Sequence, residues 1–184
     1  MRVRAHLTLL AGTTITIVAV SGLPAGAAPL PARPGAAAPA VGGALFAVSA
    51  DSPTDAWAVG RLQVQGSPVV LHWDGTAWSP VTIPATARKL FGVSAISPTN
   101  AWAVGGPGGS TPPVVLHWDG NSWTTTPAPG EGVAEAVSAD SATDVWAVGT
   151  TPLERKTAAW HWDGSSLTQV PTPSPNRLFN VLSG

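Results

Sequence analysis

The sequence predicts an all-β fold built from one unit of about 45 residues that occurs three times. Short motifs recur in the same order at spacings of 44 or 45 residues. Each unit contains four short runs of β-branched and aromatic residues, separated by Gly, Pro, Asp and Ser, and no run has a helical period. Four short strands stacked at a constant period predict β-propeller blades, because each sheet then buries its faces against its neighbours.

The four strands of each unit follow from four recurring segments. The first strand is expected at 45–49, 90–94, 134–138 and 178–182, and the second, with the motif Trp-Ala-Val-Gly, at 55–60, 100–105 and 144–149. The third ends in His-Trp-Asp-Gly at 72–75, 117–120 and 161–164, and the fourth follows at 78–81, 123–126 and 167–170. Three complete blades are therefore expected at 44–88, 89–132 and 133–177, and 178–184 begins a fourth.

The Asp-Gly pair at the end of the third segment predicts a hairpin between strands three and four. Both central residues of a type I′ turn need a positive φ, and Asp-Gly is a favoured sequence for that turn. We therefore expect a hairpin with a type I′ turn at 74–75, 119–120 and 163–164.

The first 43 residues have a different composition. Two arginines precede an apolar run at 7–23, which leads into the small residues Ala25-Gly26-Ala27. This order predicts a secretory signal peptide at 1–27, a secreted, extracellular protein and a mature chain that begins at Ala28. The alternative is an uncleaved membrane anchor, for which the apolar run is at the short limit. Residues 28–43, almost all Ala, Pro and Gly, predict a disordered linker.

Charge and missing residue types exclude several classes of function. Only 10% of the residues are charged and the formal net charge is −1, so nucleic acid is not an expected partner. The chain has no Cys, which excludes disulfides and thiolate metal sites, and no Tyr. The only acids outside the repeated columns are Glu131, Glu135 and Glu154, and no facing pair of carboxylates stands out.

The motif order resembles the kelch-type propeller repeat. The order is Ala-Val-Ser-Ala, Asp-Ala-Trp-Ala-Val-Gly, a variable loop, Val-Val-Leu-His-Trp-Asp-Gly and a Trp strand, over residues 44–184. It is most similar to repeats in secreted actinobacterial proteins. The resemblance implies the propeller fold but no single activity, since kelch-like propellers include enzymes, lectins and protein-binding scaffolds.

One histidine per unit occupies the same position, and three imidazoles on a ring are a candidate metal site. These are His72, His117 and His161. We favour a hydrogen-bond network within each blade that joins the histidine to an Asp or Asn and a Ser of the same unit. The partners would be Asp55, Asn100 and Asp144, with Ser49, Ser94 and Ser138. No metal and no cofactor are expected.

Tryptophans and variable loops supply the candidate ligand contacts. Eight of the nine tryptophans fall in repeated columns, which predicts packing between blades. Trp160 replaces the leucine of the other units and is the candidate for an exposed ligand contact. The loops between strands two and three vary in length, and the third carries Glu154, Arg155 and Lys156 as further ligand-binding candidates. The alternative for that loop is a solvated hairpin tip.

These observations predict a secreted, non-enzymatic binding scaffold whose partner is an extracellular protein or a glycan. The alternatives are a sugar-binding lectin and a fragment of a carbohydrate-active propeller enzyme. Three blades leave two open sheet faces, from which we expect self-association. Closed propellers need about four to eight blades, so we expect a truncated propeller, with two copies in one ring as the alternative.

Overall fold

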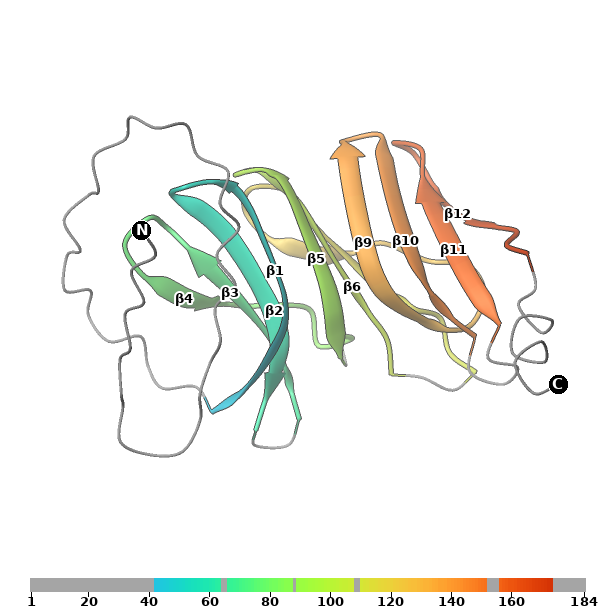
Figure 1. Ribbon diagram of the computed structural model, residues 1–184, viewed down its shortest axis with the longest axis horizontal. Helices are drawn as coiled ribbons and strands as arrows, with labels where there is room; N and C mark the ends of the chain where they lie inside the picture. Colours follow the sequence, from blue (N-terminus) through green and yellow to red (C-terminus); the bar gives the residue numbers. More distant parts are fainter. Residues whose placement is uncertain (1–41, 64–65, 88, 108–109, 152–155, 174–184) are drawn as a thin grey trace, which may run out of the picture. The chain divides into compact units, whose positions relative to one another are not determined.

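The computed structural model describes residues 42–63, 66–87, 89–107, 110–151 and 156–173. All of the described residues lie within the unit 33–184. The described residues form twelve strands in three antiparallel four-stranded sheets, with no helix among them (Figure 1). The predicted signal peptide, most of the predicted linker and the predicted fourth-blade strand lie outside the described residues.

Each sheet is formed by four consecutive strands paired in chain order. The first contains β1 (Gly43–Ser52), β2 (Asp55–Leu62), β3 (Pro68–Trp73) and β4 (Trp78–Val81). The second contains β5 (Leu90–Ser97), β6 (Asn100–Gly105), β7 (Val114–Trp118) and β8 (Trp123–Thr125). The third contains β9 (Val133–Ser141), β10 (Asp144–Thr150), β11 (Thr157–Trp162) and β12 (Leu167–Val170). The three predicted four-stranded blades are confirmed, and β1 begins two residues before the predicted strand.

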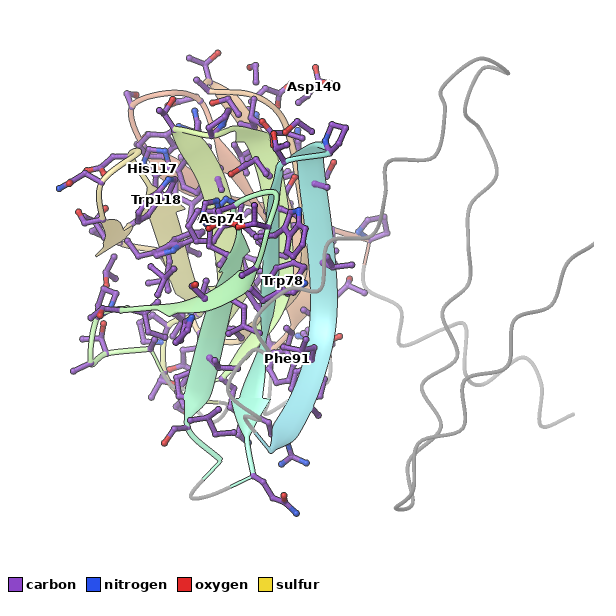
Figure 2. The ribbon with its side chains drawn as sticks, turned by 90° about the vertical axis from the view of Figure 1, so that its left-hand side faces the viewer. Asp74, Trp78, Phe91, His117, Trp118 and Asp140 are labelled. Atoms are coloured by element: carbon purple, nitrogen blue, oxygen red, sulfur yellow. The ribbon has the colours of Figure 1, made fainter. Side chains whose placement is uncertain are left out.

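The antiparallel order gives every sheet two different ends. We call the end with the connections β1–β2, β3–β4 and their equivalents the Asp end, because all seven aspartates lie in or beside those turns. We call the other end, with the connections β2–β3, β4–β5 and their equivalents, the loop end. The described Lys, Arg and Glu residues of the sheets and loops all lie at the loop end. In Figure 2, Asp140 lies near the Asp end and Phe91 toward the opposite end.

The core lies between neighbouring sheets. Trp57, Val59 and Val70 of the first sheet pack with Leu90, Leu116 and Trp123 of the second. The next interface repeats this arrangement, with Trp102, Val104 and Val115 of the second sheet against Val145, Trp160 and Leu167 of the third. Trp57 and Trp102 are almost fully buried, so the prediction that repeated tryptophans pack between blades is confirmed for these interfaces.

The two outer faces expose the same columns that the interfaces bury. Trp146 occupies the position of Trp57 and Trp102 but is 41% exposed, because no described sheet covers that face of the third sheet. On the outer face of the first sheet, Leu45 is 56% exposed, whereas its equivalent Leu90 is buried. The two open faces expected from the repeats are therefore present among the described residues.

The repeated serines join neighbouring sheets. Ser49 Oγ accepts a hydrogen bond from the backbone N–H of Ala95 at 3.0 Å, and Ser94 Oγ accepts one from Ala139 N–H at 3.1 Å. The prediction that these serines bond within their own blade is wrong. The reason is that the first strands of neighbouring sheets approach closely enough for a short hydroxyl side chain to reach the next backbone.

The hairpin at the third motif is present, but its turn differs from the prediction. Trp73 pairs with Trp78, so four residues rather than two form the loop. Asp74 Oδ1 accepts the backbone N–H groups of Thr76 and Ala77 at 2.8 and 2.9 Å, and Gly75 has a φ of 89°. In the four-residue loop, the Asp74 carboxylate accepts two backbone N–H groups of the loop itself. A two-residue type I′ turn has no such N–H groups, so these bonds favour the longer loop.

The interface column makes a matched stability prediction. We expect Trp102→Ala to lower the free energy of unfolding by about 3 to 5 kcal/mol, because it removes a buried indole from between two sheets. Trp146→Ala removes the same side chain from an open face and should cost no more than about 1.5 kcal/mol. Urea unfolding of both variants measures the difference, and equal losses would contradict the assignment of the core to the interfaces.

Candidate functional site

The Asp end is built from side chains that bond within one sheet. His72 Nε2 lies 2.5 Å from Asp55 Oδ1, and His161 Nε2 lies 2.9 Å from Asp144 Oδ1. In the second sheet, His117 Nε2 lies 3.1 Å from Asn100 Oδ1. Each imidazole also lies over the second-strand tryptophan of its own sheet, with ring centroids 4.3 Å apart. The predicted bonding of each histidine to the Asp or Asn of its own blade is confirmed.

Two further contacts fix the Asp end. Trp73 donates its indole N–H to the Pro53 carbonyl at 3.2 Å, and Trp118 donates to Pro98 at 3.1 Å, so the tryptophan of each hairpin holds the preceding turn.

The histidines of the Asp end are placed for hydrogen bonding. Burial lowers the pKa of His117, and the nearby Asp119 carboxylate raises it by a smaller amount. The described residues hold no cluster of three or more His, Cys, Asp or Glu side chains. The repeated His, Asp, Asn and Trp side chains of the Asp end therefore bond within their own sheets.

Each first strand carries a β-bulge near both of its ends, and the three bulges at the loop end lie beside the variable loops. Leu45 pairs with Gly60 and Ala47 with Val59, which leaves Phe46 as the extra residue of β1. The same shift leaves Phe91 as the extra residue of β5 and Glu135 as that of β9. A bulge turns its side chain away from the regular alternation of the strand and is often found beside functional sites. We call Phe46, Phe91 and Glu135 the bulge row.

The two phenylalanines of the bulge row contact each other. The ring centroids of Phe46 and Phe91 are 5.8 Å apart with an interplanar angle of 34°. Phe46 is 45% exposed and Phe91 is half-buried, so the pair presents an apolar surface to solvent. The guanidinium carbon of Arg61 lies 6.0 Å from the centroid of the Phe46 ring, at the outer limit of a cation–π contact. Together these side chains form an aromatic patch beside a positive charge.

A hollow of about 450 Å³ continues the row between the second and third sheets. It is lined by Lys89, Phe91, Gly106, Pro107, Val133 and Glu135. Glu135 Oε1 accepts a hydrogen bond from the Thr150 hydroxyl at 3.1 Å, which restrains the carboxylate. Among the described residues, no salt bridge joins Lys89 or Arg61 to a carboxylate. The site combines an aromatic pair, two exposed cations and one restrained carboxylate.

Trp160 is not at this site. It is 0% exposed, packs in the interface between the second and third sheets, and donates its indole N–H to the Pro129 carbonyl at 2.9 Å. The prediction of an exposed ligand contact is wrong, because its column faces the neighbouring sheet, as the buried Leu116 does in the second unit. Residues Glu154 and Arg155 lie outside the described residues. Lys156 is described, and its carbonyl accepts the Thr151 N–H at 2.9 Å in the same loop.

Sequence reasoning missed the two phenylalanines and Lys89. Glu135 stood out only as a non-repeated acid. A signal was present, because the second position of the first strand holds Phe, Phe and Glu while its neighbours keep their apolar character. The bulge itself cannot be recognised in the sequence, because it depends on the register between two strands.

Comparison with known proteins supports the fold class. No protein-family model and no curated protein matches the sequence. Among solved structures, the chain is similar to YCF48 bound to D1 peptide, with a TM-score of 0.57 and 19% identity over 73% of this chain and 42% of that one. It also resembles a fucose lectin from Kordia zhangzhouensis in complex with methyl-fucoside, with a TM-score of 0.47 and 12% identity over 69% of this chain and 99% of that one.

The chain thus spans about two fifths of the first of these structures. The three antiparallel sheets and this likeness assign the described residues to the β-propeller class. Within the described part of the chain, no helix is long and apolar enough to cross a bilayer, and the apolar run at 7–23 lies outside that part.

The histidine column predicts a stability effect without a metal effect. We expect His117→Ala to lower the free energy of unfolding by about 1 to 3 kcal/mol, because Asn100 loses its partner and Trp102 its stacked ring. Differential scanning fluorimetry should give the same melting temperature with and without added zinc or copper. A metal-induced rise in that temperature that His117→Ala abolishes would contradict the structural role.

The Asp turns predict a loss of stability in acid. Hydrogen bonds hold the pKa of Asp74 to about 2, chiefly from the Thr76 hydroxyl, and that of Asp163 to about 2, chiefly from the Ser166 N–H. An unfolded aspartate titrates near pH 3.9, so the stabilisation is complete above that value and is lost as the pH falls toward about 2. Urea midpoints of the wild type and Asp163→Ala should therefore converge over this range. A difference that stays constant down to the lowest pH would contradict the assignment.

Proposed function

We propose that this chain belongs to a secreted, non-enzymatic binding scaffold that holds its partner at the loop end of the blades. The observation that carries the proposal is the bulge row, which turns Phe46, Phe91 and Glu135 out of the strand pattern at the same end as the variable loops. Exposed aromatic side chains beside unpaired cations are typical of interaction surfaces.

The contrast between the two ends supports this location. At the Asp end, the repeated His, Asp and Trp side chains bond to their own turns and strands. At the loop end, Arg61 and Lys89 are exposed and have no carboxylate partner among the described residues. Binding specificity in repeat proteins lies in the non-repeated side chains and loops, and here those gather at one end.

The chemistry of the loop end favours binding over catalysis. A glycosidase needs two carboxylates that face each other across the scissile bond. Glu135 is the one carboxylate lining the hollow, and the Thr150 hydroxyl already holds one of its oxygens. The two solved structures named above were each determined with a ligand, a peptide in the first and methyl-fucoside in the second.

The cellular location and the repeat family are part of the same proposal. The basic start, apolar run and Ala25-Gly26-Ala27 of the sequence support export, and the motif order supports a kelch-like repeat. The partner would then be an extracellular protein or a glycan. The open faces with Leu45 and Trp146 also favour self-association of this chain.

The proposal is tested by locating binding on the molecule. We would screen the 184-residue chain against a random peptide display library and a glycan array. The loop-end variant Lys89→Ala with Phe91→Ala should bind the selected ligands about tenfold or more weakly than the wild type does. The matched control is Asp51→Ala with Asp140→Ala, which alters two exposed bulge residues at the Asp end.

The control should bind within about twofold of the wild type. Ligands that are insensitive to the loop-end variant, or chemical turnover of any glycan on the array, would overturn the proposal. Turnover would favour the carbohydrate-active enzyme, whereas loop-end binding confined to glycans would favour the lectin.

A further inference from the structure

We infer that the bulge row binds an extended peptide segment in which a carboxylate side chain lies next to an aromatic or large aliphatic one. This inference rests on the proposed function and names the chemical class of its ligand.

The apolar half of the ligand follows from the two phenylalanines. Phe46 and Phe91 come from different sheets, yet their rings lie 5.8 Å apart and remain accessible to solvent. A ring or branched aliphatic chain laid over this pair would remove apolar surface on both sides from water. The adjoining hollow of about 450 Å³ lies within the size range of ligand sites.

The charged half follows from Arg61 and Lys89. Both flank the aromatic pair, Arg61 beside the Phe46 ring and Lys89 in the lining of the hollow with Phe91. Neither forms a salt bridge to a described carboxylate, so each is available to a carboxylate of the ligand. The aspartates lie at the opposite end of the sheets, and Glu135, the one carboxylate in the lining of the hollow, already accepts the Thr150 hydroxyl.

The lining of the hollow favours a peptide over a sugar. A sugar presents several hydroxyl groups that need acceptors and donors from amide, hydroxyl or carboxylate side chains. Glu135 and Lys89 are the polar side chains of this lining, and Glu135 already accepts the Thr150 hydroxyl. The remaining lining residues are Phe, Gly, Pro and Val.

The backbone of the first strands also suits an extended chain. β1, β5 and β9 are edge strands of their sheets, so part of their backbone lies outside the ladder, although the N–H groups of Ala95 and Ala139 already donate to Ser49 and Ser94. The bulge residues Phe46, Phe91 and Glu135 lack a partner in the ladder with the second strand. An extended peptide carries matching donors and acceptors at every residue, as in other strand-edge complexes.

The test uses two labelled, end-blocked peptides with alternating Glu and Phe or alternating Gln and Phe, measured by fluorescence polarisation with the full chain. The Glu peptide should bind about tenfold or more tightly than the Gln peptide, and added salt should reduce that difference. Arg61→Gln with Lys89→Gln should remove most of the preference. Phe91→Ala should weaken both peptides by about tenfold.

The matched control is Asp51→Asn, which changes the net charge by one unit at the Asp end. It should leave both affinities within about twofold of the wild type. Thermal melts confirm folding of each variant, and Phe91→Leu replaces Phe91→Ala if the smaller side chain prevents folding.

The outcomes separate this inference from the proposed function. Equal affinity for the two peptides overturns the inference that the ligand is acidic. A preference for the Glu peptide that remains in Arg61→Gln with Lys89→Gln overturns it as well. Glycan binding that the loop-end variants abolish, without peptide binding, overturns the peptide class and leaves the binding scaffold standing. Absence of any loop-end-dependent ligand in the library, the array and the peptide pair overturns both.

Discussion

The packing of one tryptophan per unit against the next sheet is the constraint on which the rest of the structure depends. Trp57 and Trp102 fill the space between neighbouring sheets and are among the largest buried side chains of their interfaces. A single four-stranded sheet has two apolar faces and cannot cover either by itself. Stacking solves this problem, and it fixes the distance at which Ser49 reaches the backbone of Ala95.

Stacking also determines where function can reside. The faces between neighbouring sheets are used for packing, and the Asp end is used by turns whose carboxylates and indoles bond to local backbone. Among the described residues, the side chains of the loop end form no comparable set of repeated bonds, so they can change without loss of the fold. The bulges add to this freedom, because they turn Phe46 and Phe91 toward solvent at a point where the regular strand would bury or pair them.

The repeats made the fold predictable, and non-local geometry limited prediction of the site. Strand positions and the interface tryptophans could be predicted because the same apolar columns recur in every unit. Trp160 was misjudged because a column that changes residue type can keep its burial. The role of Ser49 was assigned to the wrong sheet, since sequence reveals which residues recur but not whether their partner lies in the same or the next unit. Phe46 was overlooked because its position depends on strand register.

The hydrogen bonds that join Ser49 and Ser94 to the next sheet affect how such chains can change in evolution. The second sheet supplies both halves of the junction, because Ala95 N–H donates to Ser49 of the first sheet and Ser94 accepts Ala139 N–H of the third. Any sheet can therefore follow any other, because the two halves of each junction are always supplied by different units. Recombination between repeats can then insert, delete or exchange a whole unit and still leave every junction complete. Loop-end side chains such as Glu135 can diverge unit by unit under that exchange.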